Sequence, residues 1–124
     1  MSESVKNIEL KHKIWIETND GTSILGEGKY VLLKAIEEEG SFVAAIHKLN
    51  LSYRKTWNKM KEIEDKLGFP LLETTRGGKT GGSSRLTDKA RILIDAFDKY
   101  HGKIDIVVQK AFSEFYLDLE RSGF

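Results

Sequence analysis

The sequence of 124 residues contains no cysteine and no long apolar run. Without cysteine, disulfide bonds and thiolate metal sites are excluded. A helix that crosses a bilayer needs about 20 consecutive apolar residues, and no segment approaches that length. Residues 1–6 also lack the apolar core of a secretory signal. These absences predict a cytoplasmic protein with no membrane partner.

Residue patterns for metal binding and catalysis are also missing. His12, His47 and His101 lie in three different predicted elements and do not have the spacing of metal ligands. Ser41 and Ser52 have no nucleophile motif around them and are better explained as helix caps. We therefore expect no metal, no cofactor and no enzymatic activity.

A partial match to a nucleotide-binding loop occurs at residues 77–80, Gly-Gly-Lys-Thr. The P-loop motif requires a glycine five positions before its second glycine, and Glu73 stands there. Residues 81–84 are Gly-Gly-Ser-Ser, where the motif needs the start of a helix. Nucleotide hydrolysis is therefore rejected.

The composition, 40% hydrophobic and 31% charged, is typical of a soluble domain, and the length fits one domain over residues 1–124. The formal net charge is only +1, but the charges are unevenly distributed. Residues 52–91 carry ten basic and five acidic residues, whereas the segments before and after are each net negative. Such a patch attracts polyanions. A solvated basic face is the alternative interpretation.

Alternating residues predict a β-hairpin over residues 8–25. The apolar members of the first strand are Ile8, Leu10, Ile14 and Ile16. Asn19-Asp20-Gly21 is a strong turn signal before the second strand at residues 22–25. The spacing then becomes helical and predicts a helix over residues 26–38, closed by Gly40. Its predicted buried residues are Val31, Leu32, Ala35 and Ile36.

Two further helices are predicted within residues 41–67, joined by a tight turn. Ser41 caps the first and Ser52 caps the second, while Asn50 and Gly68 end them. Their apolar residues follow helical spacing: Phe42, Ala45, Ile46 and Leu49 in the first, and Tyr53, Trp57, Met60, Ile63 and Leu67 in the second. Helices joined this closely cross at a steep angle, as in a helix-turn-helix.

The second of these helices has a polar face opposite its apolar side. This face contains Arg54, Lys55, Asn58, Lys59 and Glu62, with Lys61 at its margin. Arginine and lysine contact guanine edges, asparagine pairs with adenine and glutamate accepts from cytosine, so the face suits the DNA major groove. An ordinary charged helix surface is the alternative. Tyr53 and Trp57 could stack on bases, but their spacing favours core packing.

Residues 71–87 are predicted to form a wing, in which a glycine-rich loop joins two short strands. Glycines at positions 77, 78, 81 and 82 let the backbone approach phosphates. Cations and hydroxyl donors accompany them: Arg76, Lys79, Arg85, Thr80, Ser83 and Ser84. A flexible linker is the alternative, although linkers seldom concentrate basic residues.

Residues 88–120 show a heptad-like apolar register along one helical segment. The register contains Ala90, Leu93, Phe97, Tyr100, Ile104, Val107 and Ala111, and then shifts to Phe115 and Leu119. Because one small domain cannot cover a seam this long, it predicts a homodimer whose two recognition helices lie about one DNA turn apart. The alternative is a helix that folds back on its own domain. Gly102 predicts a kink or a break in the helix.

These motifs resemble those of a known family. Ser41-Phe42, Ala45, Leu49 and Ser52, followed by residues 67–73, resemble the winged helix-turn-helix of LysR-type regulators. More specifically, residues 52–57, residues 76–82 and Arg85-Leu86-Thr87 resemble the N-terminal DNA-binding domain of ModE-type, molybdate-responsive transcription regulators. The resemblance covers approximately residues 22–95.

The resemblance implies a dimeric DNA-binding winged helix, with Arg54, Lys55 and Asn58 directed to bases and the glycine wing to phosphates. Family members that sense molybdate use separate C-terminal β-rich domains. Because the sequence ends at Phe124, we expect no such domain and carry over no oxyanion site. The effector and the operator are not predicted.

Together these patterns predict an α+β fold, mainly α with a small β component. The expected architecture is a winged helix-turn-helix with an N-terminal β-hairpin and a long C-terminal dimerisation helix. The predicted function is a sequence-specific transcription regulator that binds double-stranded DNA. The alternative is a protein–protein interaction module that uses a winged-helix scaffold. The predicted DNA-binding residues are Ser41, Ser52, Tyr53, Arg54, Lys55, Asn58, Lys59, Arg76, Lys79, Thr80, Ser83, Ser84 and Arg85.

Overall fold

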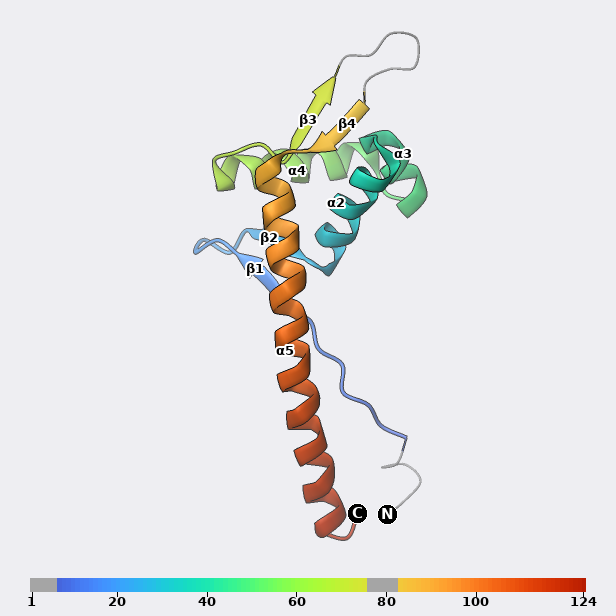
Figure 1. Ribbon diagram of the computed structural model, residues 1–124, viewed down its shortest axis with the longest axis vertical. Coiled ribbons are helices and arrows are strands. Elements are labelled where there is room, and N and C mark those ends of the chain that lie inside the picture. Colours follow the sequence, from blue (N-terminus) through green and yellow to red (C-terminus); the bar gives the residue numbers. More distant parts are fainter. Residues whose placement is uncertain (1–6, 76–82) are drawn as a thin grey trace. The chain divides into compact units, whose positions relative to one another are not determined.

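The computed structural model describes residues 7–75 and 83–124, which group into two compact units (Figure 1). The larger unit contains residues 14–96, and the smaller one contains residues 7–13 with residues 97–124. The predicted winged-helix architecture, mainly helical with small hairpins, is confirmed. Within the described ranges, no helix is both long and apolar enough to span a membrane.

The helices and strands follow one another in a simple order. They are β1 (Trp15–Glu17), β2 (Ser23–Gly26), α2 (Glu27–Glu39), α3 (Phe42–Leu49), α4 (Tyr53–Leu67), β3 (Leu72–Thr75), β4 (Ser83–Leu86) and α5 (Asp88–Arg121). β1 pairs with β2, and β3 pairs with β4, each pair forming an antiparallel hairpin. The fully buried side chains all belong to the larger unit: Leu25, Leu32, Leu33, Ile36, Met60, Ile63, Leu71, Leu86 and Ile94.

The first hairpin is shorter than the sequence predicts. β1 pairs with β2, and Ile16 lies opposite Leu25. In the turn, the Asp20 carboxylate accepts hydrogen bonds from Thr18 and Thr22, and it also contacts Lys66 Nζ of α4 at 2.6 Å. The strand prediction for residues 8–14 is wrong, because β1 begins only at Trp15.

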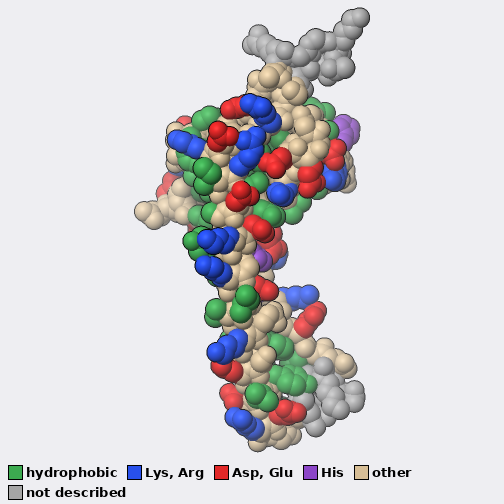
Figure 2. All heavy atoms as spheres, viewed as in Figure 1, with side chains coloured by type: hydrophobic (Ala, Val, Ile, Leu, Met, Phe, Trp, Pro, Cys, Tyr) green, Lys and Arg blue, Asp and Glu red, His purple; other side chains and the backbone are tan. Residues whose placement is uncertain are grey.

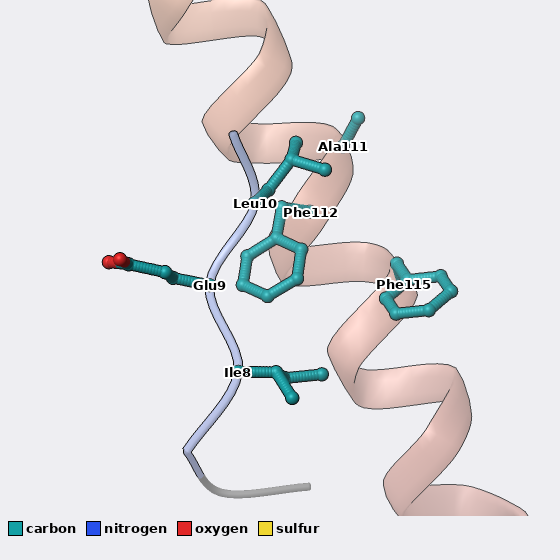
Figure 3. Close-up of a pocket in the computed structure, with 6 residues that line it drawn as sticks. All are labelled: Ile8, Glu9, Leu10, Ala111, Phe112 and Phe115. Carbon is teal, nitrogen blue, oxygen red and sulfur yellow. The ribbon is translucent and has the colours of Figure 1, made fainter. Parts of the chain in front are cut away.

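Residues 7–13 instead form an extended segment beside α5, which we call the strap (Figures 1 and 3). Ile8 and Leu10 are directed toward the helix, where they line a groove with Phe112, whereas Glu9 points away (Figure 3). His12 lies 3.9 Å from an oxygen of Asp105. Because the side chains of any extended segment alternate in direction, period two predicts which side of the strap faces the helix but does not specify a strand partner.

Helix α2 lies within a residue of its predicted bounds and ends at Gly40, which has a left-handed φ of 75°. Its buried residues include Leu32 and Ile36, as predicted. The prediction for Val31 is wrong: Val31 is 47% exposed, and Leu33 is buried instead. Adjacent positions on a helix are about 100° apart, so the apolar side is rotated slightly from the predicted one.

Helices α3 and α4 form the predicted helix-turn-helix. The Ser41 hydroxyl accepts from Ala44 N at 2.9 Å, and the Ser52 hydroxyl accepts from Lys55 N at 3.4 Å, so both caps are confirmed. Asn50 ends α3 with a φ of 54°. Ala45 is fully buried, which is consistent with the close approach of the two helices.

The wing follows α4 directly. β3 pairs with β4, with Leu72 opposite Leu86 and Thr75 opposite Ser83, so the predicted hairpin is confirmed. The glycine-rich loop at residues 76–82 lies outside the described residues. The Thr87 hydroxyl donates to Pro70 O at 2.8 Å and accepts from Ala90 N, which joins the base of the wing to the start of α5.

Helix α5 is continuous through Gly102, so the break considered there does not occur. Ala90 and Phe97 are buried as the register predicts, but Ile94 is fully buried whereas Leu93 is only partly buried. Farther along, several apolar side chains of α5 are exposed: Tyr100, Ile104, Ile106, Val107, Phe115 and Leu117. Hydrophobic side chains on the surface of the helix are also visible in Figure 2.

Candidate nucleic-acid interface

The polar face of α4 is held outward by the packing of its opposite side. Met60 and Ile63 are each 1% exposed and fix the helix to the core. Arg54, Lys55 and Asn58 are exposed, and in the described part of the chain their side chains have no hydrogen-bond or ion-pair partner. These three side chains are therefore available to a ligand.

The cations farther along α4 are already paired. Lys59 Nζ lies 3.4 Å from Glu62, and Lys61 Nζ lies 3.0 Å from Glu64. By contrast, the first turn of α4 contains no acidic residue. The positive end of the helix dipole and the two unpaired cations thus coincide at the N-terminal end of α4, where an anion is favoured.

Partial burial lowers the pKa of Lys29 on α2, and the positive charge of Lys59 lowers it further. The second cause shows that Lys29 lies close enough to Lys59 of α4 for the two ammonium groups to repel each other. A polyanion bound nearby would relieve the repulsion between the two ammonium groups.

Three aromatic rings lie at the junction of α3 and α4. The Phe42 ring contacts the rings of Tyr53 and Trp57 edge-on, with centroid distances of 5.4 and 5.3 Å. Phe42 is buried and Trp57 is partly buried, but Tyr53 is 50% exposed. Core packing is therefore the wrong prediction for Tyr53, which remains half exposed although its ring contacts those of Phe42 and Trp57.

The predicted wing residues have different environments. Ser83 is exposed and shares a 2.6 Å hydrogen bond with Thr75, while Arg85 is paired with Glu73 at 3.0 Å. Ser84 is only 8% exposed, whereas its neighbours Ser83 and Arg85 are exposed. This difference follows from strand geometry, since Ser84 is on the inner face and its neighbours are on the outer face. Arg76, Lys79 and Thr80 lie outside the described residues.

Sequence reasoning missed the residue that connects α4 to the wing. The Glu64 carboxylate accepts from Leu71 N at 2.6 Å and from Leu72 N at 3.3 Å. It thereby fixes the start of β3 against the recognition helix. No sequence signal marks Glu64, because it occurs within an ordinary run of charged residues.

A helix-turn-helix with an outward polar recognition helix and an adjacent two-stranded wing defines the winged helix-turn-helix class. The sequence pattern of the bacterial regulatory helix-turn-helix proteins of the lysR family matches residues 29–91. The chain belongs to this family of DNA-binding transcription regulators.

The chain is also similar to a molybdenum-pterin-binding protein and to a transcriptional regulator. The chain is 31% identical over 84 residues to the molybdenum-pterin-binding protein MopA of Rhodobacter capsulatus, covering 68% of this chain and 32% of MopA. It is 36% identical over 67 residues to the transcriptional regulator ModE of Haemophilus influenzae, covering 54% of this chain and 26% of ModE. The match supports a DNA-binding domain of the ModE type, as the sequence motifs predict. The chain spans about a third of the length of MopA and less of ModE.

A solved structure supports the fold independently. The protein in the crystal structure of the CbnR DNA-binding domain in complex with DNA superimposes with a TM-score of 0.52 at 20% identity. The match covers 70% of this chain and 94% of that one. At this identity the likeness shows the fold alone.

Proposed function

We propose that this chain binds double-stranded DNA sequence-specifically, as a cytoplasmic homodimer that regulates transcription. The observation that carries the proposal is the exposed, unpaired set of Arg54, Lys55 and Asn58 on α4 within the described part of the chain. In this proposal α4 enters the major groove, where arginine reads guanine and asparagine reads adenine. The remaining predicted residues position the protein on the backbone.

The wing supplies the sequence-independent part of binding. Arg85 is 74% exposed at its side chain, so its ion pair with Glu73 is accessible to solvent and exchanges readily for a phosphate. We propose that Arg76, Lys79, Thr80 and Ser83 also contact phosphates. Ser41 and Ser52 contribute the N-terminal ends of α3 and α4, which favour anions.

Dimerisation is supported by the surface of α5. Tyr100, Ile104, Val107 and Phe115 recur at helical spacing and are 53, 41, 67 and 53% exposed. A second copy that covered this stripe would bury apolar surface at both helices. The names of relatives also refer to molybdenum, but because the chain spans so little of their length we propose no effector.

A mobility-shift assay with genomic fragments, followed by sequencing of the retained DNA, tests the proposal. Binding is expected to weaken steeply as salt rises, because each phosphate contact releases counterions. A palindromic consensus is expected from a two-fold dimer. Failure to shift any fragment at low salt would contradict DNA binding, and co-purification with a protein partner instead would favour the interaction-module alternative.

Two substitutions separate base recognition from phosphate contact. Asn58→Ala should cost roughly 1–3 kcal/mol on the preferred sequence and relax specificity at one base pair, whereas Lys79→Ala should weaken binding to every sequence about equally. Lys110→Ala on α5 is the matched control for loss of a surface charge and should leave affinity unchanged. Equal behaviour of the Asn58 and Lys79 variants would contradict these roles.

A further inference from the structure

The strap contains a histidine with a buried nitrogen atom that has no partner. The Nε2 atom of His12 is buried, and no hydrogen-bond partner contacts it in the described part of the chain. Among the described residues, it is the one buried side-chain nitrogen or oxygen atom left in this state. Because buried polar atoms are normally hydrogen-bonded, this exception calls for a physical explanation.

Two titratable side chains of α5 lie against His12. An oxygen of the Asp105 carboxylate is 3.9 Å from Nε2, which is within the range of an ion pair but too far for a hydrogen bond. The His101 ring stacks on the His12 ring, with 6.0 Å between the centroids and 24° between the planes. On the strap itself, Lys11 and Lys13 flank His12, and Lys11 is already in an ion pair. The carboxylate favours a proton on His12, whereas the nearby cations oppose it.

The protonation state of His12 determines whether a hydrogen bond to Asp105 can form. A neutral imidazole carries one proton. Its Nε2 atom is then either an acceptor that no donor contacts or a donor 3.9 Å from the Asp105 carboxylate. An imidazolium donates from both nitrogens and is positively charged. Because the Asp105 side chain is 48% exposed and can move, it can then accept a charge-assisted hydrogen bond from Nε2.

The rest of the strap is held weakly, so one polar contact can determine its position. Ile8 and Leu10 are directed toward α5 beside Phe112 (Figure 3), yet they remain 40% and 38% exposed. No backbone–backbone hydrogen bond joins residues 8–13 to another residue of the described chain. Segments with few buried apolar contacts and few backbone hydrogen bonds open locally at a small cost in free energy.

We propose that the strap is a pH-dependent latch, which closes on α5 when His12 gains a proton and donates a hydrogen bond to Asp105. Histidine side chains ordinarily have a pKa of about 6.5, and aspartate side chains have one of about 3.9. The latch therefore closes as the pH falls below about 6.5 and opens again below about 4, where the carboxylate loses its charge. When closed, it fixes the segment that leads into β1. The proposal does not depend on DNA binding.

Nuclear magnetic resonance of the full chain measures the state of the strap. The Phe112 ring shifts the methyl resonances of Ile8 and Leu10 only while the strap lies against α5, and the backbone heteronuclear NOEs of residues 8–13 rise when it is held. In the wild type, the ratio of held to free strap should rise roughly fivefold from about pH 8 to about pH 5.5, because a charge-assisted hydrogen bond forms at a partly exposed site. The ratio should fall again below about pH 4.

Two variants remove the groups that form the latch. His12→Gln and Asp105→Asn should each abolish the rise, because the first side chain gains no proton and the second carries no charge. Asp118→Asn, which removes an exposed carboxylate farther along α5, is the matched control and should keep the wild-type pH dependence. Circular dichroism and thermal unfolding establish that the variants are folded.

His101 requires its own variant, because it is a second imidazole in contact with His12. His101→Phe keeps an aromatic ring at this position, and the pH dependence of the strap should remain. Loss of that dependence in His101→Phe but not in His12→Gln would assign the proton to His101 and overturn the proposal. A strap held equally at every pH, as expected if a water molecule satisfies Nε2, would also overturn it, and so would a pH dependence that survives Asp105→Asn.

Discussion

Single carboxylates determine how two peripheral hairpins attach to α4. Glu64 receives the backbone N–H groups of Leu71 and Leu72, and Asp20 receives the ammonium group of Lys66. The two acids differ in exposure: the Glu64 side chain is 10% exposed and that of Asp20 is 55% exposed. We therefore expect the buried contact to dominate stability and the exposed one to depend on pH and salt.

Glu64→Ala should lower the free energy of unfolding by roughly 1–3 kcal/mol, because Leu71 is buried and its N–H would lose its acceptor without gaining water. Chemical denaturation measures the change. Glu62→Ala, which breaks the exposed pair with Lys59, is the control and should cost less than about 0.5 kcal/mol. Equal losses for the two variants would contradict the role of Glu64.

The pH dependence of the free energy of unfolding should reveal the interaction between Asp20 and Lys66. Its hydrogen bond with Lys66, followed by those with Thr18 and Thr22, holds the pKa of the Asp20 carboxyl well below its ordinary value of 3.8. A lowered folded-state pKa stabilises the protein above the unfolded value, and this stabilisation is lost as pH falls through the folded value.

Asp20→Asn should therefore be less stable than the wild type at pH 7. The difference in the free energy of unfolding between the two proteins, which we call the gap, should narrow as the pH falls below 3.8. Denaturation curves at several pH values measure this gap. A gap that stays constant down to strongly acidic pH would show that the Asp20 charge is not involved.

At the scale of elements, the sequence predicted helix ends reliably, because the backbone at a helix end favours particular residue types. Ser41, Ser52, Gly40 and Gly68 were assigned as helix ends from the sequence, and each lies at a helix end. Predictions that depended on which neighbour packs against a face were less reliable. Ile8 alternates with polar residues as a strand would, but it packs against α5.

The two serine caps should differ in strength. Ser41→Ala should cost about 1 kcal/mol, and Ser52→Ala should cost less, because the Ser41 cap bond is shorter, at 2.9 against 3.4 Å, and lies in a less exposed position. Urea unfolding of both variants measures which substitution lowers the free energy of unfolding more. Ser41→Asn, which retains a capping oxygen, should recover most of the lost stability. A greater loss of stability for Ser52→Ala than for Ser41→Ala would show that the Ser52 cap is the stronger one.

For the whole molecule, the central expectation is two-fold assembly through α5. Its exposed apolar residues recur at helical spacing from Tyr100 to Phe115, which is typical of an interaction surface. At about 100° per residue, Val107 lies on the stripe with Ile104, whereas Ile106 lies on the opposite side of the helix. The two neighbours are similarly exposed, at 67 and 70%, and so form a matched pair for substitution.

Val107→Glu should convert the dimer to a monomer and weaken binding to a palindromic site, because a carboxylate would be buried at the interface. Ile106→Glu should leave assembly unchanged. Sedimentation velocity over a range of concentrations measures both. A wild type that sediments as a monomer throughout would overturn the dimer, and dissociation by Ile106→Glu would assign the interface to another face.

The sequence by itself determined the helix-turn-helix, its caps, the wing and the family, because these depend on backbone preferences and spacings encoded within a few residues. Only the tertiary structure decided which neighbours cover each face. In the tertiary structure, residues 7–13 lie beside α5 and helix α5 continues through Gly102. Val31 and Tyr53 are exposed, and Ser84 is buried. The physical reason is that periodicity gives the direction of a side chain, whereas burial depends on contacts between segments distant in sequence.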